Sequence, residues 1–304
     1  RPSTRATYRR PWIRWHNWAT SNNISPTNPT PATLAQFLAF LHTEVKLSPS
    51  SIALHKSVVT TWSNPDQSTA LATHPLVIKM LKGISATKPR HQTRTIWDVN
   101  QLRSWIEANP PAQDSFFQTS RHIAILLLLA SGRRIHDLTL LHMDPTHFQR
   151  VPPDIVLWPA FGAKTDSTSC EQSGWRLLPD DTQPLWNAVS WMEHFLTLRA
   201  QRCGTQPLTN LFVSTRGRVK PASRAIIAKW VTTALTNAGI DASPGSYRSS
   251  VNSALAQAQV PIDVILARAN WRSANTFLRH YYKTITRSSS MTGPSLGRNF
   301  APTV

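Results

Sequence analysis

Two arginines stand where a rigid helix end could hold them against a phosphate. Arg134 follows a strongly apolar stretch in "LLLLASGRRIHDLTLL", and Arg248 opens another helical pattern in "SPGSYRSSVNSALA". A guanidinium forms two parallel hydrogen bonds to a phosphate and stays charged at neutral pH. Taken alone, each arginine is more often structural, for instance Arg134 paired with Asp137 three residues later. The two positions are therefore candidates for anion binding that need support from other motifs.

Two of the four tyrosines stand side by side in "NWRSANTFLRHYYK", near the end of the chain. A phenol has a pKa of about 10 and is a poor nucleophile until a cationic site favours its phenolate, which can then attack a phosphate. Neighbours on a helix point about 100° apart, so only one of Tyr281 and Tyr282 can face a given phosphate. Trp271, which precedes them, could donate its indole N–H to a phosphate oxygen or be a core aromatic.

Other common catalytic patterns do not occur in the sequence. It has no Gly-rich phosphate loop, no HExxH, no paired carboxylates and no metal-ligand spacing, so we expect neither a metal nor another cofactor. Cys170 and Cys203 form no ligand-spaced cluster, and we interpret them as reduced thiols of an intracellular protein. The longest apolar run, residues 123–130, is far shorter than the roughly 20 residues that span a bilayer, so no membrane partner is expected. The N-terminus has no signal-peptide pattern, and because the chain begins at Arg1 we interpret it as a fragment or trimmed form.

The charge balance favours a polyanionic partner. The 304 residues include 33 Lys and Arg against 15 Asp and Glu, a formal net charge of +18, which most simply indicates nucleic acid. Residues 1–94 hold 12 of these basic residues but only two acids, Glu44 and Asp66. We predict that DNA contacts in this part of the chain come from Arg9, Arg10, Arg14, Lys56, Lys88, Arg90 and Arg94.

The elements that must position these residues are mostly helical, and the length of the chain favours two domains. Before residue 85 we predict four helices, in "TYRRPWIRWHNWA", "TPATLAQFLAFLHTEV", "SPSSIALHKSVVTTW" and "HPLVIKMLKGI". Thr30 is the predicted cap of the second helix. Its apolar stripe is formed by Leu34, Phe37, Leu38 and Leu41.

Aromatic residues recur at helical spacing in the first predicted helix. The set is Tyr8, Trp12, Trp15 and Trp18. Such spacing is more typical of a core face, although a surface on which bases stack is the alternative.

The remainder of the chain has a mixed pattern. Residues 85–97 are polar, basic and without periodicity, which is typical of a linker. Several helical patterns follow, with two short strands, "PDIVLWPA" and "GWRLLPD", around a hairpin. We therefore predict a mainly α fold with a small β-sheet: a helical domain at residues 1–88, a linker at 89–96, an α+β domain at 97–284 and a flexible or partner-docking tail at 285–304.

Four short motifs, "GRRIHDLTLL", "FGAKTDS", "GSYR" and "NWRSANTFLRHYY", follow one another along the chain. In this order they resemble motifs of the tyrosine recombinase (phage-integrase-like) family, and within it the recombinases of DIRS-type retrotransposons. "GRRIHDLTLL" matches the family's Arg-x-x-(Glu/Asp)-Leu box at Arg134, and "FGAKTDS" looks like the β-hairpin turn with the catalytic lysine, here Lys164. "GSYR" stands where the family has His-x-x-Arg, giving Arg248. "NWRSANTFLRHYY" resembles the Trp/His box and the nucleophile, giving Trp271 and Tyr281. The resemblance implies a core-binding domain at residues 1–88 and a catalytic domain at 97–284.

The resemblance also implies a reaction. Arg134 and Arg248 would stabilise charge on the phosphate, Tyr281 would form a 3′-phosphotyrosyl intermediate, and Lys164 would protonate the leaving 5′ oxygen. An exposed turn lysine without a catalytic role is the alternative for Lys164. The implied function is DNA strand cleavage and exchange, in site-specific or integrative recombination of a mobile element. Further expectations are double-stranded DNA clamped between the domains, a homotetramer on two duplexes, and an intracellular, nuclear location.

One position departs from the family pattern. Gly245 stands where His-x-x-Arg has its histidine, which removes an imidazole from the implied site. A working site that lacks this group and a DNA-binding protein that has lost catalysis are both compatible with the change. A type IB topoisomerase, which shares the constellation, is a further alternative. If Gly245 adopts a positive φ after Pro244, a side chain there would strain the loop.

Overall fold

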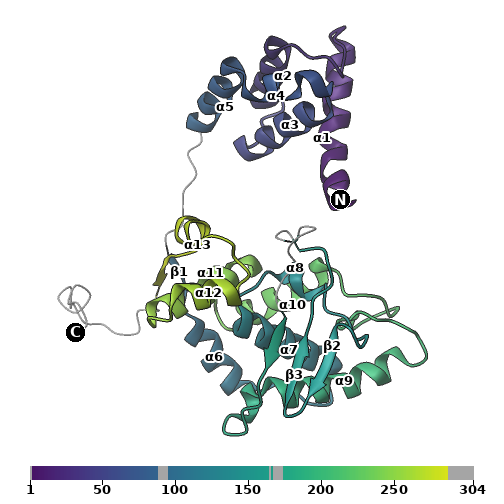
Figure 1. The fold of residues 1–304 in the computed structure, drawn as a ribbon, viewed down its shortest axis with the longest axis vertical. Helices are drawn as coiled ribbons and strands as arrows, with labels where there is room; N and C mark the ends of the chain where they lie inside the picture. Colours follow the sequence, from purple (N-terminus) through teal and green to yellow (C-terminus); the bar gives the residue numbers. More distant parts are fainter. Residues whose placement is uncertain (1, 88–94, 164–165, 167–173, 287–304) are drawn as a thin grey trace, which may run out of the picture. The chain divides into compact units, whose positions relative to one another are not determined.

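The computed structural model describes residues 2–87, 95–163, 166 and 174–286 (Figure 1). Residues 1–92 form one compact unit and residues 93–304 form another. The chain is mostly helical with a small antiparallel sheet, which confirms the predicted fold class. No helix among the described residues is both long enough and apolar enough to cross a membrane.

The N-terminal unit has five helices in its described part, one more than predicted. They are α1 (Pro2–Ser21), α2 (Pro31–Thr43), α3 (Pro49–Trp62), α4 (Pro65–Thr73) and α5 (Pro75–Thr87). Each begins with a proline, which suits the first helical position because an N–H there would have no partner within the helix. Thr30 caps α2 as predicted, since its Oγ1 accepts the N–H of Thr33 at 3.1 Å. The helix missing from the prediction is α4, in which Leu71 is the one buried residue, so it has no apolar stripe.

Three of the four aromatic residues predicted on α1, Trp12, Trp15 and Trp18, belong to or pack against the core of this unit. Trp15 is fully buried, and its indole N–H donates to the carbonyl of Pro26 at 2.9 Å. Its ring stacks on Trp18 and meets Phe37 edge-on, with ring centroids 5.7 and 5.0 Å away. The predicted stripe of α2 is fully buried in the same cluster. The core interpretation is thus confirmed, and Trp15 is not available to stack on bases.

The second unit is built from helices around a small sheet. Its α-helices in the described part are α6 (Val99–Ala108), α7 (Phe116–Ser131), α8 (Ile135–Leu138), α9 (Ala188–Cys203), α10 (Arg224–Asn237), α11 (Tyr247–Gln257), α12 (Ile262–Arg268) and α13 (Ala274–His280). Two short 3₁₀ helices, η1 (Pro184–Trp186) and η2 (Pro244–Ser246), precede α9 and α11.

Three antiparallel strands form the main sheet of this unit in the order β2 (Phe148–Val151), β3 (Asp154–Leu157), β4 (Trp175–Leu177). The strands β3 and β4 are the two predicted from the sequence. A second, parallel pair joins β1 (Thr95–Trp97) to β5 (Thr284–Thr286). This pair differs from the predicted boundaries, because β1 begins inside the predicted linker and β5 extends beyond residue 284.

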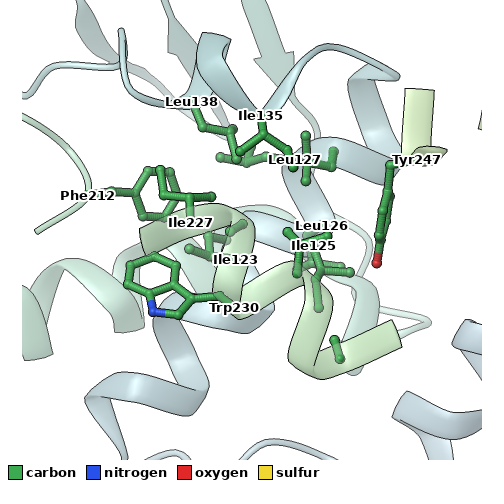
Figure 2. Close-up of a cluster of buried hydrophobic side chains, with 14 of the residues drawn as sticks. Ile123, Ile125, Leu126, Leu127, Ile135, Leu138, Phe212, Ile227, Trp230 and Tyr247 are labelled. Atoms are coloured by element: carbon green, nitrogen blue, oxygen red, sulfur yellow. The ribbon is translucent and has the colours of Figure 1, made fainter. Parts of the chain in front are cut away.

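The core of the second unit surrounds α7, which is buried continuously from Ile123 to Leu128. Figure 2 shows α7 side chains gathered with Ile135 and Leu138 of α8 and with Ile227 and Trp230 of α10. A helix that is apolar on all sides needs such cover. Its burial fixes the end of α7, and therefore the loop that carries Arg134.

Candidate active site

The segment before α8 presents Arg134. Helix α7 ends at Ser131 and is capped by Gly132, which has the left-handed conformation (φ 59°, ψ 21°) that glycine adopts without strain. Arg134 then caps α8, and its backbone N–H donates to the carboxylate of Asp137 at 3.1 Å. No salt bridge joins the Arg134 guanidinium to an acidic side chain in the described part of the chain. Asp137 thus orders the backbone of this segment and leaves the guanidinium available for an anion.

Arg248 lies in the first turn of α11 and is only 2% exposed. Its Nη1 donates to the carbonyl of Gly132 at 3.2 Å, whereas Nε and Nη2 are buried and have no hydrogen-bond partner among the described residues. Burial lowers the pKa of Arg248 to about 10, and the positive charge of Arg134 lowers it as well, while Tyr281 and Asp137 raise it. Arg248 is therefore still charged at neutral pH. The structure brings the two predicted arginines together, and an anion between them would relieve their repulsion.

Trp271 and Tyr281 complete a stack with Arg248. The guanidinium carbon of Arg248 lies 3.9 Å from the ring centroid of Trp271 and 5.4 Å from that of Tyr281. The two aromatic rings have centroids 4.8 Å apart. The indole N–H of Trp271 is buried and has no partner among the residues that the structure describes. Both predicted roles of Trp271, as a donor and as a packing residue, are compatible with this position.

The two adjacent tyrosines separate at the end of α13. The helix ends at His280, and the N–H of Tyr281 donates to the carbonyl of Phe277 at 2.8 Å, so the expectation that both tyrosines lie within a helix is wrong. Tyr281 turns to Arg248 and Trp271, whereas Tyr282 packs edge-on against Phe277 and is 46% exposed. Of the two phenols, that of Tyr281 is the one placed beside Arg248.

Gly245 lies in η2, immediately before α11. Its φ is not in the left-handed region, and a Cβ atom added to it would meet nothing within 4 Å. The sequence-based concern that a side chain would strain this loop is therefore wrong. Position 245 therefore has room for the Cβ of an alanine.

The predicted lysine, Lys164, lies outside the described residues, as do Lys88, Arg90 and Arg94 of the predicted DNA contacts. Strands β3 and β4 bracket the Lys164 segment. The N–H groups of Gly162 and Ala163 donate to the carboxylate of Asp166 at 2.8 and 2.7 Å. Asp166 therefore orders the backbone at Gly162 and Ala163, a role that the sequence did not predict.

The remaining predicted DNA contacts lie on α1 and α3. Arg9, Arg10 and Arg14 are exposed along α1, and Arg14 also donates to the imidazole of His55 at 3.3 Å. Lys56 is half-buried on α3. The described residues contain no cluster of three or more His, Cys, Asp or Glu side chains that could hold a metal ion.

Two polar residues of α11 support the site and were missed by the sequence analysis. Asn252 donates from Nδ2 to the carbonyls of Gly132 and Arg248, at 3.0 and 2.7 Å. Ser253 donates to the carbonyl of Tyr281 and accepts the N–H of Lys283, both at 3.1 Å. The polar run in "YRSSVNSALA" was the available signal, because a helix that buries Ser and Asn must give them partners.

The fold of this chain is similar to that of several solved structures. The chain is similar to the XerH site-specific recombinase in a post-cleavage complex with palindromic difH substrate, with a TM-score of 0.60 and 15% identity over 89% of this chain and 74% of that one. It is also similar to the integrase of the Tn1549 transposon in complex with circular intermediate DNA, with a TM-score of 0.51 and 14% identity over 86% of this chain and 83% of that one.

The chain has the tyrosine recombinase fold. The sequence itself matches no protein-family model and no curated protein. In this fold, the residues that the sequence resemblance selected from three separate boxes, Arg134, Arg248 and Tyr281, lie in one place on the second unit.

Proposed function

We propose that this protein is a tyrosine-type DNA recombinase, which cleaves and rejoins DNA strands through a 3′-phosphotyrosyl intermediate. The observation that carries the proposal is the stack of Arg248 on Trp271 and Tyr281, in which two guanidinium nitrogens and the indole N–H are buried without partners among the described residues. Buried donors of this kind are costly unless a ligand satisfies them. A phosphodiester offers acceptor oxygens of the required charge, beside a phenol that can attack.

In the proposed reaction the hydroxyl oxygen of Tyr281 attacks the phosphorus, and the bond from phosphorus to the 5′ oxygen breaks. Negative charge grows on the non-bridging oxygens, where Arg134 and Arg248 stabilise it without giving up a proton. The phenol proton passes to water, because Tyr281 is only partly buried. Lys164 protonates the departing 5′ oxygen as general acid. A 5′ hydroxyl of another strand then reverses these steps, so the phosphodiester energy is conserved and no ATP is needed.

The DNA partner is supported by the net charge of +18 and by the exposed arginines of α1. The XerH and Tn1549 structures are themselves DNA complexes. We propose that both units bind double-stranded DNA, that four copies assemble on two duplexes, and that the reaction moves or integrates a DIRS-type mobile element in the nucleus.

Gly245 favours one competing function, a DNA-binding protein that no longer cleaves. The position lacks the imidazole of the His-x-x-Arg pattern. The two functions differ in one observable, a covalent bond between protein and DNA. Relaxation of supercoiled plasmid at no particular site would instead indicate an activity like that of type IB topoisomerases.

The test is a nicked suicide substrate made from candidate element ends. The short fragment with the freed 5′ hydroxyl diffuses away, so the covalent adduct accumulates. We expect adduct from the parent chain, and a loss of about 10² to 10³ in rate for Arg134→Ala and for Arg248→Ala. Arg150→Ala is the matched control, because Arg150 pairs with Glu193 at 2.7 Å on the surface. Tight DNA binding without any adduct would favour the non-catalytic function.

A further inference from the structure

Asn252 is fully buried one helical turn after Arg248. Its Nδ2 donates to the carbonyl of Gly132 at 3.0 Å, and the same carbonyl accepts from Nη1 of Arg248 at 3.2 Å. A second bond from Nδ2 reaches the carbonyl of Arg248 at 2.7 Å. One backbone oxygen at the end of α7 is thus shared by the arginine and the asparagine.

The chemistry of these contacts fixes the orientation of the amide. Both neighbours of Nδ2 are carbonyl oxygens, which only accept, so the side chain must present its NH₂ group to them. Gly132 and Asn252 also fit closely, because a Cβ at Gly132 would lie 2.4 Å from Nδ2. The amide of Asn252 therefore occupies the space that a side chain at position 132 would need, and the glycine there makes room for it.

The consequence for Arg248 follows from its hydrogen bonds. The bond from Nη1 to the carbonyl of Gly132 anchors the guanidinium to the end of α7, and it leaves Nε and Nη2 unpaired among the described residues. Asn252 holds the Gly132 carbonyl in place and ties α11 to the end of α7. Without Asn252, the guanidinium would keep its charge but could turn or retreat from the position over Trp271.

We infer that Asn252 is a positioning residue for the phosphate-binding Arg248, acting through the carbonyl of Gly132. The inference rests on the proposed function, since it assigns Asn252 a part in the same site. It makes two demands. Removing the Nδ2 donors must weaken the action of Arg248 on the phosphate, and it must change the environment of the Arg248 guanidinium even when no DNA is present.

The first test compares cleavage of two DNA substrates by the full chain. One has an ordinary scissile phosphate, and the other has a methylphosphonate there, which removes one negative charge. We expect Asn252→Ala to lower the cleavage rate of the ordinary substrate by about 10- to 100-fold, the range that small displacements of a catalytic group produce. The loss should shrink on the neutral substrate, as it should for Arg248→Ala, because less charge needs stabilising. An equal loss on both substrates would overturn the inference.

Asn252→Asp and Ser250→Ala serve as matched variants. Aspartate keeps the shape but places a carboxylate oxygen against two carbonyls, so its rate should fall at least as far as that of Asn252→Ala. Ser250 is also fully buried on α11, and its hydroxyl has no partner among the described residues. Ser250→Ala should cleave within about twofold of the parent rate, because no hydrogen bond is lost. Full activity in Asn252→Asp would contradict the assigned donor role.

The second test does not depend on catalysis. In the full chain labelled with ¹⁵N-arginine, the Nε–H signal of Arg248 is identified by its absence in Arg248→Lys. We expect Asn252→Ala to shift this signal and to speed its exchange with water, while Ser250→Ala leaves it in place. An unchanged Arg248 signal in Asn252→Ala overturns the inference. Failure of the proposed function would appear separately, as the absence of adduct from the parent chain.

Discussion

The guanidinium carbon of Arg248 lies 3.9 Å from the ring centroid of Trp271, and the indole N–H of Trp271 is buried without a partner in the described part of the chain. The ring can thus support the arginine while its N–H remains free for a phosphate oxygen. Substitution of Trp271 can separate the support of the arginine from the hydrogen bond to the phosphate. Phenylalanine keeps an aromatic ring but has no N–H donor, whereas histidine has a smaller ring and an N–H donor.

We expect cleavage rates to fall in the order parent, Trp271→His, Trp271→Phe, Trp271→Ala. The phenylalanine variant should lose about 10-fold or more, because one donor to the developing oxyanion is missing. The alanine variant should lose more, because Arg248 and Tyr281 also lose the surface on which they pack. Single-turnover cleavage measures this order, with DNA affinity as the control. Equal rates for phenylalanine and the parent would show that the indole N–H does not contact the phosphate.

Gly245 provides a second prediction, sharpened by the open space around it. Gly245→Ala should fold normally and cleave within about twofold of the parent, because its Cβ meets no atom. Gly245→His adds an imidazole three residues before Arg248, and a well-placed general acid or base is worth about 10² to 10⁴ in rate. We expect a gain of about tenfold over the alanine variant in single-turnover cleavage. No gain, with folding and DNA binding intact, would show that another group already fills this role.

Ser253 leads to a third prediction, about the placement of the nucleophile. Tyr281 lies beyond the end of α13, so the helix alone does not fix it, and the Ser253 hydroxyl bonds to both Tyr281 and Lys283. Ser253→Ala should lower adduct formation about 10-fold and leave DNA affinity unchanged, because the tyrosine would be less often in position to attack. Ser253→Thr keeps the hydroxyl and should restore most of the rate. Equal loss in both variants would indicate a packing effect instead.

The sequence predicted those parts of the fold and site that depend on local pattern. Helix α2 and the strands β3 and β4 have clear periodicity or turn signals, and Thr30 has the side chain of a helix cap and is followed by an apolar stripe. Arg248 and Tyr281 stood in recognisable boxes. The structure shows that these two residues are in contact, because the guanidinium carbon of Arg248 lies 5.4 Å from the ring centroid of Tyr281.

Other features depend on contacts between distant residues and gave no local signal. The pairing of β1 with β5 joins residues 95–97 to residues 284–286, and each strand has only three residues. The bond from Asn252 to Gly132 spans 120 residues, so no pattern around either residue could predict it. The positive φ considered as an alternative for Gly245 does not occur, because this glycine lies within a short 3₁₀ helix, although glycine after proline is common in turns with positive φ.

The N-terminal unit supports a fourth prediction, about the salt dependence of DNA binding. Arg9 and Arg10 are exposed on α1 and form no salt bridge among the described residues, so both are available to phosphates. The slope of log K against log salt falls by about 0.9 for each phosphate contact removed. The double variant Arg9→Gln with Arg10→Gln should therefore lower the slope by about 2, whereas Arg150→Gln should not change it. An unchanged slope in the double variant would exclude this face of α1 from the DNA contact.

The fifth prediction concerns the nucleophile, and it tests the proposed reaction most directly. After reaction of the full chain with the suicide substrate, nuclease and protease digestion followed by mass spectrometry identifies the peptide that carries a nucleotide. We expect the nucleotide on Tyr281, no adduct from Tyr281→Phe, and normal adduct from Tyr282→Phe, because only Tyr281 lies beside Arg248. A nucleotide on Tyr282, or no adduct from a chain that binds the DNA tightly, would contradict the account.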